Sequence, residues 1–136
     1  MQNRIQRVEI TERAQTLLRR IIEDNGPVLF RQSAHDGDTE MTPVCLAVKE
    51  FPIEKADVLL GRLTWHTEFW ISRTQFERCW KDTHLTVDAV RGQADPDSLE
   101  ADHGMRFVVR ARQLTAAENA ALAAAPPLRT GADRTL

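Results

Sequence analysis

Residues that could bind a metal lie together in the first third of the chain. The stretch contains an imidazole, three carboxylates and a thiol, contributed by His35, Asp36, Asp38, Glu40 and Cys45. Imidazole, carboxylate and thiolate groups bind zinc and iron, so one interpretation is a divalent metal site. Its candidate ligands are His35, Asp36, Asp38 and Cys45. The alternative is a solvated acidic turn with Cys45 as a small core residue. No spacing here matches a recognised metal site, so the acidic turn is favoured.

The same residues could serve a small enzyme. To act as a nucleophile, Cys45 would need a depressed thiol pKa and a neighbouring base. Nothing in the spacing brings a histidine close to it; the histidines are His35, His66, His84 and His103. The chain has no Cys-x-x-Cys pair and no Gly-x-Ser-x-Gly motif, so neither dithiol nor hydrolase chemistry is indicated. An inert buried thiol is therefore the favoured interpretation of Cys45.

A second constellation lies in the alternating segment HLTVDAV. Alternation places His84, Thr86 and Asp88 on one face of a strand, with successive side chains on that face about 7 Å apart. An imidazole and a carboxylate thus share this face. Such a pair can perform acid–base chemistry or hold one ligand. The alternative is the solvent-exposed face of a sheet, which is the more common role of such residues.

Two surface features could mark a binding site. The segment 105–112 alternates strictly, which places Arg106, Arg110 and Arg112 outward, where they could bind an anionic ligand or the acidic patch of a partner. The alternative is a cationic edge that deters strand pairing. Trp65 lies at an expected turn between strands, and an exposed tryptophan there would suit an interface.

The elements that must position these residues are visible in the apolar pattern. Thr11 is placed to cap an amphipathic helix that Gly26 ends, and a long polar loop follows the next strand as far as Phe51. Strands are expected at 8–10, 28–32, 57–63, 68–71, 84–90 and 105–112, and further helices at 73–81 and from Thr115 to 125. A polar loop is expected at 92–104.

This pattern predicts a single α+β domain over 1–125 and a disordered tail over 126–136. We expect the N-terminal helix to pack on a curled, mostly antiparallel sheet that forms a sandwich or partial barrel, followed by a short C-terminal helix.

No signal sequence is visible at the N-terminus, so a cytoplasmic protein is expected. No apolar run is long enough to span a membrane, and a pI near 6.1 without a basic stripe argues against nucleic acid as a partner.

Several short segments resemble one bacterial family. In order they are FRQS, PVC, TQFE, THLTVD, SLE and GMRF, and the resemblance as a whole extends from about residue 10 to residue 113. The chain is identified by them as a member of the bacterial family catalogued as domain of unknown function 779. Genes of that family often lie beside aldehyde or alcohol dehydrogenases. The resemblance therefore implies a non-catalytic accessory role in aldehyde oxidation, with an aldehyde dehydrogenase as the partner. We expect the protein to be a homodimer.

A fainter resemblance is to the A-type iron–sulfur carriers of the HesB-like fold. It implies a metal-binding or carrier function, with zinc or iron as the possible cofactor. Typical members of the first family carry Gly-Gly-Cys-Cys-Asp-Gly after the strand, where this chain has residues 34–40 without a cysteine. Only Cys45 remains, in the Pro-x-Cys position, so any metal or cluster site here would be altered.

Overall fold

The computed structural model describes residues 6–32, 43–50, 53, 57–77, 82–94, 98–125, 128, 130 and 131. The candidate metal ligands His35, Asp36 and Asp38 lie outside these residues. The described elements, in chain order, are β1 (Val8–Ile10), α1 (Glu12–Asn25), β2 (Val28–Gln32), β3 (Val44–Ala47), β4 (Val58–Leu63), β5 (Thr67–Ile71), α2 (Arg73–Gln75), β6 (Thr83–Arg91), β7 (Met105–Gln113) and α3 (Ala116–Ala123). A 3₁₀ helix, Leu99–His103, lies between β6 and β7.

The strands form two mixed sheets. The smaller has the order β1-β6-β7, in which β1 is parallel to β6 and β7 is antiparallel to it. The larger has the order β3-β2-β5-β4, in which β2 and β5 are parallel. The class is α+β, as expected, but the expected curled sheet is wrong, because neither sheet curls or closes. Alternation shows which face of a strand is apolar, whereas the pairing of strands distant in sequence is decided by tertiary packing.

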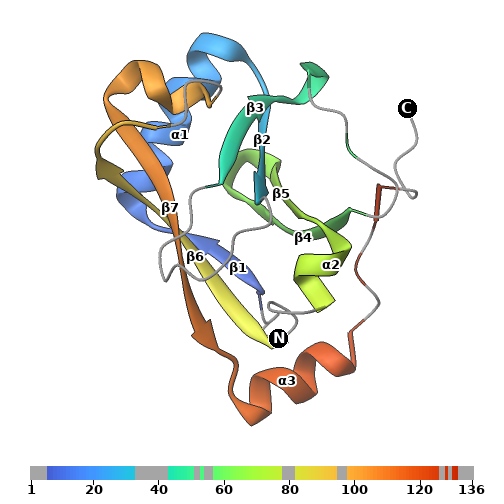
Figure 1. Ribbon diagram of the computed structural model, residues 1–136. Coiled ribbons are helices and arrows are strands. Elements are labelled where there is room, and N and C mark those ends of the chain that lie inside the picture. The colour runs from blue at the N-terminus through green and yellow to red at the C-terminus, as the bar shows by residue number, and fades with distance from the viewer. Residues whose placement is uncertain are drawn as a thin grey trace.

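The main core lies between the two sheets. Figure 1 shows β6 and β7 with α1 beside them on one side of the molecule, and β2 to β5 on the other. Phe30 of β2 meets Phe107 of β7 edge-on, with the ring centroids 4.8 Å apart. The buried residues of α1 are Ala14, Leu17, Leu18 and Ile21, which repeat at helical spacing and join the same core. One helix face and two sheet faces thus share a single apolar interior.

The ends of α1 follow from local chemistry. The Thr11 hydroxyl accepts a hydrogen bond from the Ala14 amide at 3.3 Å, which satisfies an amide that the first turn leaves without a partner. Gly26, with φ of 79°, donates from its amide to the Ile22 carbonyl at 2.8 Å. A positive φ is accessible to glycine at little cost. The predicted start and end of this helix are confirmed.

The larger sheet also buries residues on its outer face. Leu29, Leu59 and Trp70 form a second apolar cluster there, separate from the main core. Residues of β4 therefore contribute to both clusters, which confirms the expectation that the segment 57–63 is covered on both faces. Phe69 lies in the main core, as the alternation of β5 predicts.

Three local expectations differ from the structure. β3 lies within the segment expected to be a polar loop, and it pairs with β2 from Val44 to Ala47. The second expected loop contains the 3₁₀ helix Leu99–His103. Ala111, expected to face inward, is exposed, as are the other residues of β7 from Arg110 to Gln113. Of the expected helix at 73–81, the structure describes α2 and the two residues that follow it.

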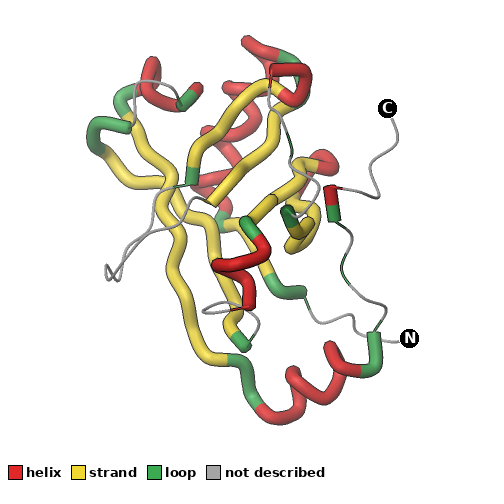
Figure 2. Tube along the Cα trace, turned by 45° about the vertical axis from the view of Figure 1, so that its right-hand side comes forward, coloured by secondary structure: helices red, strands yellow, loops and turns green. Residues whose placement is uncertain are grey.

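After β7, the chain leaves the body and returns to it. Figure 2 shows α3 lying apart from the strands, and none of its residues is buried. The capping box expected at Thr115 and Glu118 is confirmed. Within 126–136, where disorder was expected, Thr130 forms a bridge to Val58 and the Gly131 amide donates to the Asp57 carbonyl at 2.8 Å. Among the described helices, none has the length and apolarity needed to cross a membrane.

Candidate functional site

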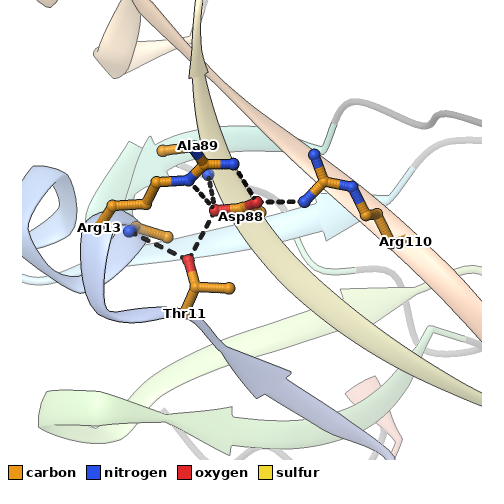
Figure 3. A network of polar contacts seen from close by, with 6 residues as sticks. Thr11, Arg13, Asp88, Ala89 and Arg110 are labelled. Atoms are coloured by element: carbon orange, nitrogen blue, oxygen red, sulfur yellow. Dashed lines mark hydrogen bonds and ion pairs between the residues drawn. The ribbon is translucent and has the colours of Figure 1, made fainter.

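Asp88, near the middle of β6, is the centre of a polar network. Its side chain is 5% exposed. Oδ1 accepts from the Thr11 hydroxyl at 2.7 Å, from Arg13 Nε at 2.6 Å and from the Ala89 amide at 2.8 Å. Oδ2 accepts from a terminal nitrogen of Arg13 at 2.6 Å and from one of Arg110. Figure 3 shows the two guanidinium groups approaching the carboxylate from opposite sides. Both carboxylate oxygens are thus fully engaged.

Three elements bring these groups together. β1 runs parallel to β6, and the Thr11 amide donates to the Val87 carbonyl at 3.0 Å, so α1 begins beside Asp88. In the β6–β7 register Arg110 lies opposite Thr86, two residues from Asp88 on the same face. The diagonal distance in such a pair is within reach of an arginine side chain. The same Thr11 hydroxyl caps α1, so the positive end of the helix also faces the carboxylate.

The network keeps Asp88 ionised. Hydrogen bonds from Arg13 lower the pKa of Asp88 far below its ordinary value, and those from Thr11, Arg110 and Ala89 add to the effect while burial opposes it. A carboxylate that holds its proton so weakly is a poor general base near neutral pH. Asp88 is therefore suited to holding cations in place.

The two cations face outward. The side chains of Arg13 and Arg110 are 60% and 50% exposed, although each is bonded to a buried acid. A guanidinium has five N–H donors, so each group retains donors on its solvent side. Two cations against one anion leave a net positive charge at the surface. The arrangement holds arginine donors in place at the surface.

His84 and Arg112 lie further along the same face. His84 is 5% exposed, and its Nε2 lies 3.6 Å from a carboxylate oxygen of Glu9. Burial, followed by the charge of Arg112, lowers the pKa of His84, so the imidazole is neutral near pH 7. Arg112 forms two hydrogen bonds with Glu118 of α3, at 2.8 and 2.9 Å.

His84 and Asp88 share one face of β6, as predicted, but both residues are buried. The alternative interpretation, a solvent-exposed face of a sheet, is therefore wrong for these two residues. His84 lies beside Glu9 and is influenced by the charge of Arg112, whereas Asp88 accepts hydrogen bonds from Arg13 and Arg110. The two groups therefore have separate partners and do not form an acid–base pair.

A second polar cluster is enclosed in the interior. The Cys45 amide donates to the Ser98 hydroxyl at 2.8 Å, and that hydroxyl donates to Glu100. The other oxygen of Glu100 accepts from the Phe107 amide at 3.2 Å. Burial, assisted by the charge of Glu100, raises the pKa of the Cys45 thiol well above its ordinary value. This environment disfavours the thiolate, which is the reactive form of cysteine.

Residues 17–113 match the family described as Domain of unknown function (DUF779). The chain belongs to the DUF779 family. No curated protein and no solved structure matched the sequence in the corresponding comparisons. The match includes Asp88, Arg110 and the whole Cys45–Ser98–Glu100 cluster, but not Thr11, Arg13 or α3.

The remaining predicted site residues of this DUF779 protein are dispersed. Arg106 lies against Gly92, at the far end of β7 from Arg112. Trp65 is 51% exposed in the turn between β4 and β5, on the other sheet, and has φ of 61°. A positive φ is uncommon for a bulky residue. No group of three or more metal-ligating side chains occurs within the described residues, and three of the candidate ligands lie outside them.

Sequence reasoning missed Arg13, Ser98 and Glu100. The family resemblance contained a signal for two of them, because SLE matched as a segment and contributes both Ser98 and Glu100. Arg13 had no comparable signal. It lies on the polar side of an amphipathic helix, where arginines are ordinarily solvated, and only the parallel pairing of β1 with β6 brings it to Asp88.

Proposed function

We propose that this DUF779 protein is a non-catalytic accessory protein that binds the acidic surface of a partner through Arg13 and Arg110. The observation that carries the proposal is the Asp88 network, in which a buried carboxylate fixes two half-exposed guanidinium groups. Fixed arginines lose less conformational entropy on binding than mobile ones, and they recognise carboxylates in a bidentate geometry. The described acids and the thiol, by contrast, are arranged unfavourably for catalysis.

The family resemblance supplies the partner for this proposal. An aldehyde dehydrogenase encoded beside the protein would present the acidic surface, and the accessory protein would act as a cytoplasmic homodimer. Trp65, which is half-exposed on the other sheet, would serve the contact between the two copies. Exposed tryptophan is enriched at such interfaces.

Co-purification tests the proposal. The tagged protein should retain the aldehyde dehydrogenase at micromolar concentrations, and the double variant Arg13→Gln, Arg110→Gln should lose it. The matched control is Arg19→Gln, Arg20→Gln, which removes the same charge from exposed positions of α1 and should retain the enzyme. Equal retention by the two double variants would contradict the proposal.

A metal-binding or iron–sulfur-carrier-like protein is the second proposal. Its support is the position of Cys45 in β3, which follows the segment with the other candidate ligands, and the charge of Glu100, which acts on the Cys45 thiol. Elemental analysis of protein purified without chelator or affinity metal tests it. Stoichiometric zinc or iron that is lost in Cys45→Ser would support this function, and protein free of metal would exclude it.

A further inference from the structure

α3 forms one side of an arch. Glu118 of α3 accepts two hydrogen bonds from Arg112 of β7, which anchors the start of the helix. Beyond the end of the helix, the Gly131 amide donates to the Asp57 carbonyl at 2.8 Å, so the chain is anchored again. No residue of α3 is buried, and Figure 2 shows the helix lying apart from the strands. A helix held on both sides in this way leaves room between itself and the body.

That room is a cavity of about 460 Å³. The apolar part of its wall consists of Val58, Phe76, Leu122, Ala123, Ala125 and Leu128. Two arginines, Arg7 and Arg73, also line it. Sites for small molecules have volumes of roughly 300–1,000 Å³ and a mostly apolar lining with a few polar groups. The cavity agrees with such sites in its volume and in its lining.

Three large apolar side chains of the wall are only partly buried, and they come from both sides of the cavity. Phe76 and Leu128 pack against the main core and so belong to the body. Leu122 is the one large apolar residue of α3, in which the other apolar residues are alanines. Apolar area that stays in contact with water is a source of binding free energy for any molecule that covers it.

The charges around the cavity are balanced. The Arg7 guanidinium lies over the Phe76 ring, 5.3 Å from its centroid. Burial lowers the pKa of Arg7 and the charge of Asp82 opposes this, so Asp82 acts as a counter-charge. Arg73 forms an ion pair with Glu77 at 3.4 Å. An anionic ligand would have to compete with these acids, and a cationic ligand would meet two arginines. The wall therefore favours a molecule without charge.

We infer that this cavity binds an uncharged small molecule with a hydrocarbon body, of which a medium-chain alcohol is an example. The hydrocarbon body lies between Leu122 of α3 and the side chains of Phe76 and Leu128. It covers the apolar wall and leaves the charges around it balanced. The inference goes beyond the proposed function and stands independently of it, since it shares no residue with the surface formed by Arg13, Asp88 and Arg110.

Isothermal titration calorimetry with 1-butanol, 1-hexanol and 1-octanol tests the inference. Each added methylene should tighten binding by up to about fourfold, because it removes further apolar area from water. Octanoate and octylamine carry a similar chain with a negative or a positive charge, and both should bind at least about tenfold more weakly than 1-octanol. An affinity that does not depend on chain length, or an ion that binds as tightly as 1-octanol, would overturn the inference. Absence of 1-octanol binding would do the same.

A pair of variants on α3 locates the site. Leu122→Trp fills the cavity and should weaken 1-octanol binding about tenfold or more, and the fold should tolerate it because no residue of α3 is buried. Ala120→Trp is the matched control, since it places the same side chain at an exposed position of α3 that does not line the cavity. Equal affinity in the two variants would overturn the inference.

Amide chemical shifts of the wild-type protein give a test that needs no variant. 1-Octanol should shift the signals of α3 and Phe76 and leave those of Asp88 and its neighbours unchanged. Shifts distributed over the whole surface would indicate nonspecific binding and would overturn the inference.

Discussion

Asp88 and Glu100 are both buried carboxylates, yet their surroundings differ. Asp88 binds two guanidinium groups whose side chains are 60% and 50% exposed. Glu100 is 1% exposed and accepts from the Ser98 hydroxyl and the Phe107 amide. Asp88 therefore connects the interior with surface cations, whereas Glu100 joins the 3₁₀ helix Leu99–His103 to β7 and, through the Ser98 hydroxyl, to Cys45 of β3.

The difference shows how one chemical group can serve two purposes. A buried carboxylate surrounded by arginines is strongly stabilised in its charged form, and it fixes those arginines for a partner. The Glu100 carboxylate accepts from a hydroxyl and a backbone amide in the interior, and it orders the backbone around it. The proposed binding surface therefore lies at Asp88, and we assign a structural function to Glu100.

The largest effect is expected from Asp88→Asn. The amide keeps the size of the side chain but loses the charge, so both guanidinium groups lose their anion. We expect unfolding free energy to fall by about 3 kcal/mol, as for the loss of a buried charged hydrogen-bonding group. Urea denaturation measures the change. Asp102→Asn, at an exposed position, is the control and should change stability little.

Acidification should remove most of the difference in unfolding free energy between the wild type and Asp88→Asn. The folded-state pKa of Asp88 lies below its unfolded value, so its contribution is present above about pH 4 and is lost as the pH falls further. The wild type should therefore lose more stability than Asp88→Asn below pH 4, and the two curves should approach each other. Glu118, with a pKa lowered to about 2 chiefly by Arg112, titrates in both proteins and cancels in the difference. Parallel curves would contradict the account of Asp88.

A smaller effect is expected from Glu100→Gln. The amide oxygen still accepts one hydrogen bond, and the site no longer has to bury a charge, so the cost should be about 1–2 kcal/mol. Removing the charge should also lower the pKa of Cys45, although the pKa should stay above its ordinary value because burial is the larger cause. The pH dependence of thiolate absorbance measures this. A destabilisation as large as that of Asp88→Asn would contradict the proposal that the two buried carboxylates have different functions.

Much of the local structure could be predicted from the sequence. The limits of α1 follow from Thr11 and Gly26, whose capping chemistry is local, and the core faces of β6 and β7 follow from their alternation. The face shared by His84 and Asp88 was also correctly predicted. These features depend only on residues close together in the chain.

The features that were not predicted depend on contacts distant in sequence. Arg13 reaches Asp88 across 75 positions, and Cys45 reaches Ser98 across 53. The segment 92–104 has the composition of a solvated loop, but Ser98 and Glu100 are buried because each finds hydrogen-bond partners there. Composition alone cannot show that hydrogen bonds offset the cost of burying a polar side chain. The two separate sheets were missed for a related reason, since parallel pairing leaves no local signal.

The most direct test of the partner-binding account is the salt dependence of affinity for the aldehyde dehydrogenase, measured for the wild type and for Arg110→Gln. Exposed charges on a binding surface are screened by salt, so wild-type affinity should fall steeply as ionic strength rises. Arg110→Gln should bind more weakly at low salt and show a shallower dependence. Wild-type affinity that does not change with salt, or identical dependence in the two proteins, would contradict the proposal that these arginines bind the partner.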